Sequence, residues 1–442
     1  MNYSKDGKRN STEAMLAVVA VGCAADITGL NVAAAGVEIN QRKFVMVDEY
    51  LRTRIGFLSL RRSNIKTGIP NKEVEAGGPH VGLVPHGRGW IVNARETWYN
   101  LWFCFSGGSR MRRILGLAAV IVALSPSLAL AGSYKVTYLV SDLPGLNAQI
   151  TDPLLQNPWG IALSASSPFW ISNAGSLSAT VYSGDVGGRP LMKSPTEVHL
   201  PGPPTGQVAG SGSDFNGDHF IFSTLNGLIC GWALGTTAAT RATVPGAVYN
   251  GLALGTGSDG LKYLYAPNTR GGTIDVFDSN YDQVDSPGGF VDAGLDPKYS
   301  PFNVQLVNGV YLFVTYLDTT DADEGGVVNV FDTDGNLLQR FAQDGTLNAP
   351  WGVAQAPDSF GDFGGAILIG GFGDGRISAF DGSGNFLGLL SDKEGNPWVF
   401  ERLWALSFGN GGSGGSTDTL YFTAGINNQQ DGLLGSLKPR RR

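Results

Sequence analysis

Cysteine and histidine are scarce in this chain of 442 residues, which contains three cysteines and four histidines. Cys23 and Cys104 precede residue 131, so Cys230 is alone beyond that point and no disulfide can form there. The two histidines of that part, His199 and His219, have no His or Cys at the short spacing that zinc ligands show. A zinc site and a Ser-His-Asp triad are therefore disfavoured, and the lone thiol is expected to be an inert core residue.

Long hydrophobic runs are also lacking. The apolar segment Ile114–Leu124 is shorter than the roughly 20 residues that a membrane-spanning helix needs. The basic pair Arg112 and Arg113 precedes it, and the small-residue motif Ala129–Ala131 follows it. This order is typical of a secretory signal peptide over residues 111–131, cleaved directly after the motif. We expect a secreted or periplasmic protein with no stable membrane span after cleavage; a single-pass anchor is the alternative.

Positive charge is scarce after residue 131, where 15 Lys and Arg residues face 29 Asp and Glu residues. Residues 1–110 have the opposite balance, with 14 basic and 9 acidic residues. Such a shift marks a boundary, and we predict that residues 1–110 are a disordered leader from an over-extended start. A small additional N-terminal domain is the alternative. The acidic balance of the remainder argues against binding to nucleic acid or to an anionic membrane.

Long amphipathic helical patterns are absent, and the chain instead repeats a phrase. LQNPWGIALS (Leu155–Ser164) returns as LNAPWGVAQAP (Leu347–Pro357). Degenerate copies begin at Gly206, Tyr249, Pro301 and Arg402. A repeat near fifty residues indicates a closed or stacked array of similar units. The recurring tryptophans Trp159, Trp351 and Trp404 are expected to be core wedges between units rather than platforms for sugars.

Each copy is followed by a short apolar segment of strand character. These segments begin at Phe169, Phe220, Tyr263, Tyr311, Ile367 and Leu420. The pattern predicts an all-β fold, a six-bladed β-propeller, over residues 132–438, followed by a basic tail at 439–442. Tyr134–Leu143 belongs to no unit and the last unit lacks an outer strand, so pairing of the two would close the ring. A β-sandwich or an open solenoid is the alternative.

Phe-Asp pairs precede Gly- or Asn-containing turns at Phe277, Phe331 and Phe380, where the Asp can cap the turn while the Phe packs inward. With Gly325–Pro357, these turns resemble the NHL repeat of six-bladed propellers. The segment LVSDLPGLNAQITDPLLQNPWGIALS and the ending FTAGINNQQDGLLGSL also resemble an exported bacterial family of uncharacterised propellers. Some of its members have a C-terminal sorting tail, which KPRRR does not match. The resemblance implies the fold and export, but no reaction.

Candidate ligand-binding residues lie in the loops that precede the innermost strands or follow the second strands, where propellers bind ligands. They are mostly amides: Asn157, Asn173, Asn226, Asn250, Asn268, Asn303, Asn348 and Asn427. Such amides can bind a sugar or a peptide, but Asn and Asp are also ordinary turn residues. The acidic residues Asp318, Asp321, Asp323 and Asp374 are the candidate ligands of a calcium ion, which prefers oxygen donors.

Two functions follow from these residues. The first is a monomeric binding module for a protein or carbohydrate, with no catalytic constellation. The second is a calcium-dependent lactonase or esterase with a cation at the channel mouth, in which Asp374 is the candidate base. No glutamate lies at the matching channel positions, which weakens this second function. A quinone-dependent sugar dehydrogenase is disfavoured because the cationic groups and histidines expected for its cofactor are missing.

Overall fold

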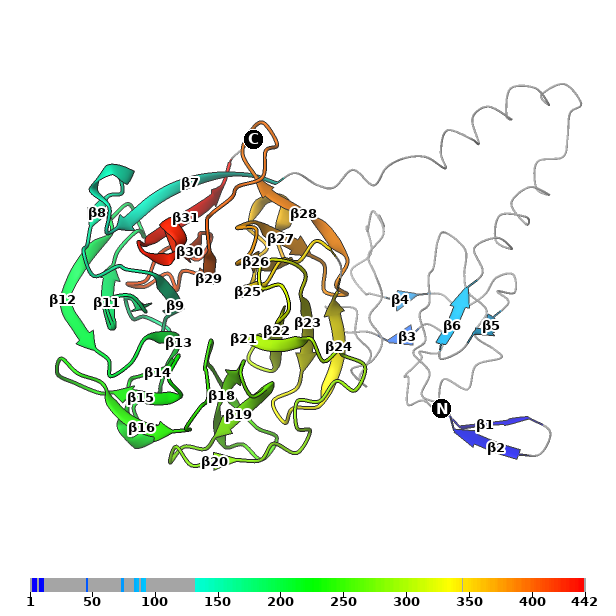
Figure 1. Cartoon of the computed structure of the whole chain (residues 1–442). Coiled ribbons are helices and arrows are strands. Elements are labelled where there is room, and N and C mark those ends of the chain that lie inside the picture. The colour runs from blue at the N-terminus through cyan, green and yellow to red at the C-terminus, as the bar shows by residue number, and fades with distance from the viewer. Residues whose placement is uncertain are drawn as a thin grey trace, which may run out of the picture. The chain divides into compact units, whose positions relative to one another are not determined.

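Figure 1 shows the computed structural model, which describes residues 132–343 and 345–440 and six short strands among the first 92 residues. The chain divides into two compact units, Met1–Ser125 and Pro126–Arg442. Three antiparallel pairs are described in the first: β1 (Asn2–Lys5) with β2 (Lys8–Ser11), β3 (Val45–Met46) with β4 (Glu73–Val74), and β5 (Leu83–His86) with β6 (Gly89–Val92).

The predicted signal peptide at 111–131 lies outside the described residues. The assignment of residues 1–110 as a leader stays a prediction. Within the described part of the chain, no helix combines the length and the apolar character needed to cross a bilayer.

The second unit is a β-propeller, and in four of its sheets the strands are antiparallel and follow one another in chain order. Four sheets have four strands each. They consist of β9 (Pro158–Ala162), β10 (Phe169–Asn173), β11 (Ser178–Ser183) and β12 (Met192–His199); β13 (Pro204–Ala209), β14 (Phe220–Thr224), β15 (Leu228–Trp232) and β16 (Ala239–Thr243); β17 (Ala253–Thr256), β18 (Lys262–Asn268), β19 (Thr273–Phe277) and β20 (Gln283–Val284); and β21 (Tyr299–Val307), β22 (Tyr311–Asp318), β23 (Val327–Phe331) and β24 (Leu337–Ala342).

A nine-stranded sheet holds the remaining strands. They are β25 (Pro350–Gln355), β26 (Ile367–Gly371), β27 (Ile377–Phe380), β28 (Phe386–Ser391), β29 (Leu403–Phe408), β30 (Leu420–Ala424), β31 (Leu433–Pro439), β7 (Gly132–Ser141) and β8 (Ile150–Thr151). Short helical turns occupy Pro144–Leu146, Phe215–Gly217, Gly361–Phe363 and Ile426–Gln429. All the predicted second strands are confirmed as β10, β14, β18, β22, β26 and β30.

The turns between the third and fourth strands form as the sequence predicts. In the turn after β23, Asp332 accepts hydrogen bonds from the backbone N–H of Asn336 at 2.8 Å and from its side-chain amide at 2.9 Å. Phe331 beside it is fully buried. Gly335 in the same turn has φ = +82°, a conformation that favours glycine. The residues of this turn therefore stabilise the hairpin in the predicted way.

The strand β7, at the start of the second unit, pairs with strands near the C-terminal end of the chain and so closes the ring (Figure 1). It pairs antiparallel with β31, from Ser141 opposite Leu433 to Tyr134 opposite Pro439, which confirms the predicted pairing. Its first residues also pair in parallel with β28, where Gly132 lies opposite Leu390. The sequence did not predict this second contact, which joins two four-stranded groups and, with β8 paired to β7, makes one nine-stranded sheet.

Apolar side chains fill the space between consecutive sheets. Trp170 of the β9–β12 sheet stacks on Phe220 of the β13–β16 sheet, with ring centroids 4.0 Å apart. Tyrosine hydroxyls add bonds between neighbours, as where Tyr281 donates to Asp218 at 2.7 Å. Figure 1 shows the sheets around a common centre, with β9, β13, β21, β25 and β29 innermost. The start of each innermost strand therefore lies near the ring axis.

Candidate functional site

An aromatic cluster occupies the axis where the innermost strands begin. Trp159 stacks on Trp404 with ring centroids 3.5 Å apart, and both meet Trp351 edge-on at 6.2 and 5.7 Å. Phe302 and Phe372 pack against Trp404 and against each other in the same cluster. The three tryptophans are 5%, 3% and 1% exposed, so none of them offers a surface on which a sugar could stack.

This cluster corrects the expectation that the tryptophans are wedges between neighbouring units. Their core character is confirmed, but Trp159 and Trp351 contact each other although a third group of strands, β29–β31, lies between their sheets. The reason is geometric. Equivalent positions of the innermost strands converge on the axis, so large side chains there meet one another instead of the flanking sheets.

Three of the eight candidate asparagines form hydrogen bonds with tryptophans of this cluster. Asn157 accepts a hydrogen bond from the indole of Trp404 at 3.1 Å. The backbone carbonyl of Asn250 accepts one from the indole of Trp351 at 2.9 Å, and the side chain of Asn303 donates to the carbonyl of Trp351 at 2.7 Å. The structure thus brings these three together around the aromatic rings.

The other five amides bond to nearby strands and loops. The partners are Ser178 and Thr180 for Asn173, Thr224 for Asn226, Val248, Gly271 and Asp275 for Asn268, Gly325 and Asp374 for Asn348, and Asp431 for Asn427. Most of these bonds hold a turn or a loop in place, which is the usual role of Asn in such positions.

The acidic candidates have protein partners of their own. Asp318 forms an ion pair with Lys298 at 2.7 Å. That bond, with those from the side chain and N–H of Thr320, holds the pKa of Asp318 well below its ordinary value. Asp323 pairs with Arg402, whose guanidinium lies 4.7 Å from the centre of the Phe372 ring.

Asp321 and Asp374 accept backbone N–H bonds from Asp323 and Arg376. Asp374 also accepts a bond from the side chain of Asn348 at 3.0 Å. Within residues 132–343 and 345–440, no three His, Cys, Asp or Glu side chains form a group that could hold a metal ion. The four acidic candidates are therefore not gathered into one cluster.

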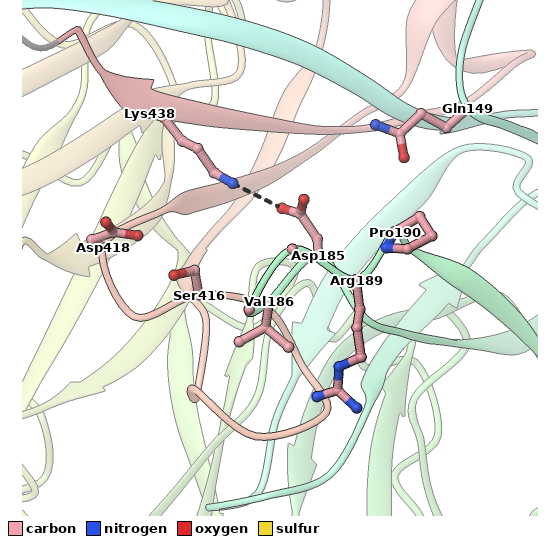
Figure 2. A pocket seen from close by; sticks show the side chains of 10 residues that line it. Gln149, Asp185, Val186, Arg189, Pro190, Ser416, Asp418 and Lys438 are labelled. Carbon is pink, nitrogen blue, oxygen red and sulfur yellow. Dashed lines mark ion pairs between the residues drawn. The ribbon is translucent and has the colours of Figure 1, made fainter.

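A pocket of about 780 Å³ lies elsewhere, beside the place where β7 closes the ring (Figure 2). Its walls come from the loop between β11 and β12 (Asp185–Pro190), the loop between β29 and β30 (Ser416 and Asp418), Lys438 of β31, and Gln149. None of these residues was predicted. The pocket exists only because the ring closes, so no local signal in the sequence could have shown it.

Two opposite charges are linked on the wall of this pocket. The ammonium of Lys438 lies 3.6 Å from a carboxylate oxygen of Asp185, which also accepts a bond from the hydroxyl of Tyr421 at 2.6 Å. Burial and the Asp185 carboxylate both raise the pKa of Tyr421 far above its ordinary value, so the phenol stays a donor. Asp185 is therefore fixed between two donors.

The other two charges of the pocket are less constrained. A hydrogen bond from Ser416, opposed by partial burial, lowers the pKa of Asp418, so this carboxylate is ionised at neutral pH. Arg189 is exposed and follows Gly187 and Gly188, which both have positive φ and open space around them. Among the described residues its guanidinium has no hydrogen-bond or ion-pair partner, and in Figure 2 it points away from Lys438 and Asp185.

Comparison with known proteins gives relatives of undescribed function. The chain is 30% identical over 359 residues to "Uncharacterized protein R648" of Acanthamoeba polyphaga mimivirus, covering 73% of this chain and 84% of that protein. It is also 30% identical over 338 residues to "Uncharacterized protein L690" of the same virus, covering 69% and 86%. The chain belongs to the family of these two proteins. No family model matches it.

Solved propeller structures are only distantly similar to this member of the R648 and L690 family. A virginiamycin B lyase from Staphylococcus aureus covers 70% of the chain at 14% identity, with a TM-score of 0.43 and all of its own length matched. The PQQ-bound aldose sugar dehydrogenase from Streptomyces coelicolor covers 71% at 18% identity, with a TM-score of 0.43 and 99% of its length matched. A gluconolactonase from Xanthomonas campestris covers 64% at 15% identity, with a TM-score of 0.31 and 95% of its length matched.

Proposed function

We propose that the protein is an exported, six-bladed β-propeller that binds a charged ligand in the pocket of Figure 2. Export rests on the order of basic, apolar and small residues over 111–131. The blade count is supported by six hydrophobic clusters, each lying between consecutive groups of strands. It is also supported by the split of the nine-stranded sheet into β25–β28 and β29–β31 with β7.

The observation that carries the binding proposal is the combination of a ligand-sized cavity with a cation that has no partner among the described residues. A volume of about 780 Å³ lies within the range of small-molecule sites. The exposed guanidinium of Arg189 can bind a carboxylate or phosphate through two parallel hydrogen bonds. Asp418 on the same wall is ionised and can accept a cationic or hydroxyl group.

These groups favour a ligand that carries an acidic group and a donor together. A charged segment of a protein and an acidic carbohydrate both have this chemistry. Gln149 and Ser416 supply neutral hydrogen-bonding groups on the same wall. The glycines before Arg189 leave the loop backbone open to close approach by such a ligand.

The test is a thermal-shift screen of the purified chain against short peptides with both charges and against acidic saccharides. A compound that binds the native state should raise the melting temperature. Arg189→Gln should then weaken its binding about tenfold or more, corresponding to roughly 1.4 kcal/mol. Arg376→Gln, which changes another exposed arginine away from the pocket, is the matched control.

Two outcomes would contradict the proposal. The first is that no charged peptide or saccharide changes the melting temperature. The second is that a compound binds but Arg189→Gln and Arg376→Gln affect it equally, which would place the ligand elsewhere on the protein.

A further inference from the structure

Two buried polar atoms at the ring axis lack partners among the described residues. They are the indole nitrogen of Trp159 and the side-chain oxygen of Asn250, whose residues are 5% and 7% exposed. The equivalent tryptophans Trp351 and Trp404 both donate to asparagine oxygens. Trp159 thus differs from the other two tryptophans of the cluster, since its indole N–H has no acceptor in the described part of the chain.

The orientation of the Asn250 amide is fixed by its neighbours. Its nitrogen lies 2.8 Å from the hydroxyl oxygen of Thr269, and that hydroxyl donates in turn to the carbonyl of Pro301 at 2.7 Å. Because Thr269 has one hydroxyl hydrogen and uses it on Pro301, it can only accept from Asn250. The group that faces Thr269 is therefore the NH₂, and the free atom is a hydrogen-bond acceptor.

Both unpartnered atoms belong to residues that contact Trp351. The ring of Trp159 meets the ring of Trp351 at 90°, and the indole of Trp351 donates to the backbone of Asn250. The aromatic residues of the cluster come from β9, β21, β25 and β29 and from the loop after β26. The corresponding positions of the other two groups of strands hold Thr205 and Asn250, whose side chains are smaller than these aromatic rings.

We propose that the ring axis holds a binding site for a hydroxyl group beside Trp351. The hydroxyl oxygen accepts the hydrogen bond of the Trp159 indole, and the oxygen of Asn250 accepts a hydrogen bond from the bound molecule. A buried donor and a buried acceptor left unpaired are both costly, so natural proteins satisfy such groups with ordered water where the chain cannot. The hydroxyl is that of water or of a small polyol, and the site is separate from the pocket of Figure 2.

The deciding experiment is a high-resolution crystal structure of the full chain, grown and cooled without glycerol or sugars. We expect density within about 2.7–3.2 Å of the Trp159 indole nitrogen, with a bound oxygen also in reach of Asn250. Absence of density at both atoms would overturn the proposal. Titration with glycerol then shows whether the bound hydroxyl belongs to water or to a small polyol. A change in tryptophan fluorescence that Trp159→Phe abolishes identifies a polyol site, and an unchanged spectrum identifies water.

Three matched variants provide a second measurement, because Trp159→Phe, Trp351→Phe and Trp404→Phe remove the same ring volume and one N–H each. Trp351→Phe and Trp404→Phe break bonds that the structure shows. If a hydroxyl occupies the site, the urea midpoint of Trp159→Phe should fall at least half as far as that of Trp404→Phe. A smaller fall, or a rise, would mean that the indole of Trp159 has no partner. Where density and variants disagree, the density decides.

Discussion

The axial cluster is where a single substitution should damage the fold most, and Trp351 is its best test. Its side chain is 3% exposed, contacts Trp159 and Trp404, and donates to the carbonyl of Asn250. Removing a buried aromatic ring of this size leaves a cavity and costs about 3–5 kcal/mol of unfolding free energy. We therefore expect Trp351→Ala to lose about that amount.

The hydrogen bond can be separated from the ring. Trp351→Phe keeps most of the aromatic contacts but removes the N–H, which leaves the carbonyl of Asn250 without its donor. An unsatisfied buried acceptor costs about 1–3 kcal/mol, so this variant should lie between the wild type and Trp351→Ala.

Equilibrium unfolding in urea, followed by far-ultraviolet circular dichroism, measures both variants by linear extrapolation. Circular dichroism is preferred because each variant lacks a tryptophan that contributes to the fluorescence. The exposed Val399→Ala, at 58% exposure, is the control and should change stability by less than about 0.5 kcal/mol. A loss below about 1 kcal/mol for Trp351→Ala would refute the assignment of this ring to the core.

Three further outcomes are expected. Burial raises the pKa of Cys230 to about 12, so a thiol reagent at neutral pH should not label it in the folded protein. Mass spectrometry measures the labelling, and rapid labelling would show that the strand opens. Lys298 holds the pKa of Asp318 low, so their pair stabilises the fold above about pH 4 and the stabilisation is lost as the pH falls below that value. Asp318→Asn should therefore lower the urea midpoint more at about pH 6 than at about pH 2, where part of the stabilisation has been lost, whereas an equal effect at both would exclude this linkage. Because Asp318 and Asp323 already have cationic partners, calcium and a chelator should leave the melting temperature unchanged, and a rise with calcium would favour the hydrolase function instead.

The strands and hairpins could be predicted because their signals are local. A Phe followed by Asp and a Gly-Asn turn determines a hairpin within about ten residues, as Asp332 and Asn336 show. The pairing of β7 with β31 could also be predicted, since β7 belonged to no unit and the last unit, which ends with β31, lacked an outer strand. The parallel contact of Gly132 with Leu390 could not, because nothing in either segment distinguishes that edge from any other.

The site could be predicted less well because it depends on which residues converge. The amide positions lie at the expected strand ends, but Asn268 and Asn348 use their side chains to hold loops. The sequence places tryptophans at equivalent positions without showing that they meet at the axis. Gln149 and Lys438 share one pocket although 289 positions separate them in the chain, and only the closed ring brings them together.

The joining of β7 to β31 has a consequence for how the molecule is made. During synthesis β7 emerges long before β31 exists, so its edge must wait unpaired until nearly the whole chain has followed. An unpaired strand edge is a template for another chain. A molecule interrupted before β31 would keep this edge open, and two complete molecules could exchange β7 and close each other's rings. The ring can therefore close only after β31 has been synthesised and has paired with β7.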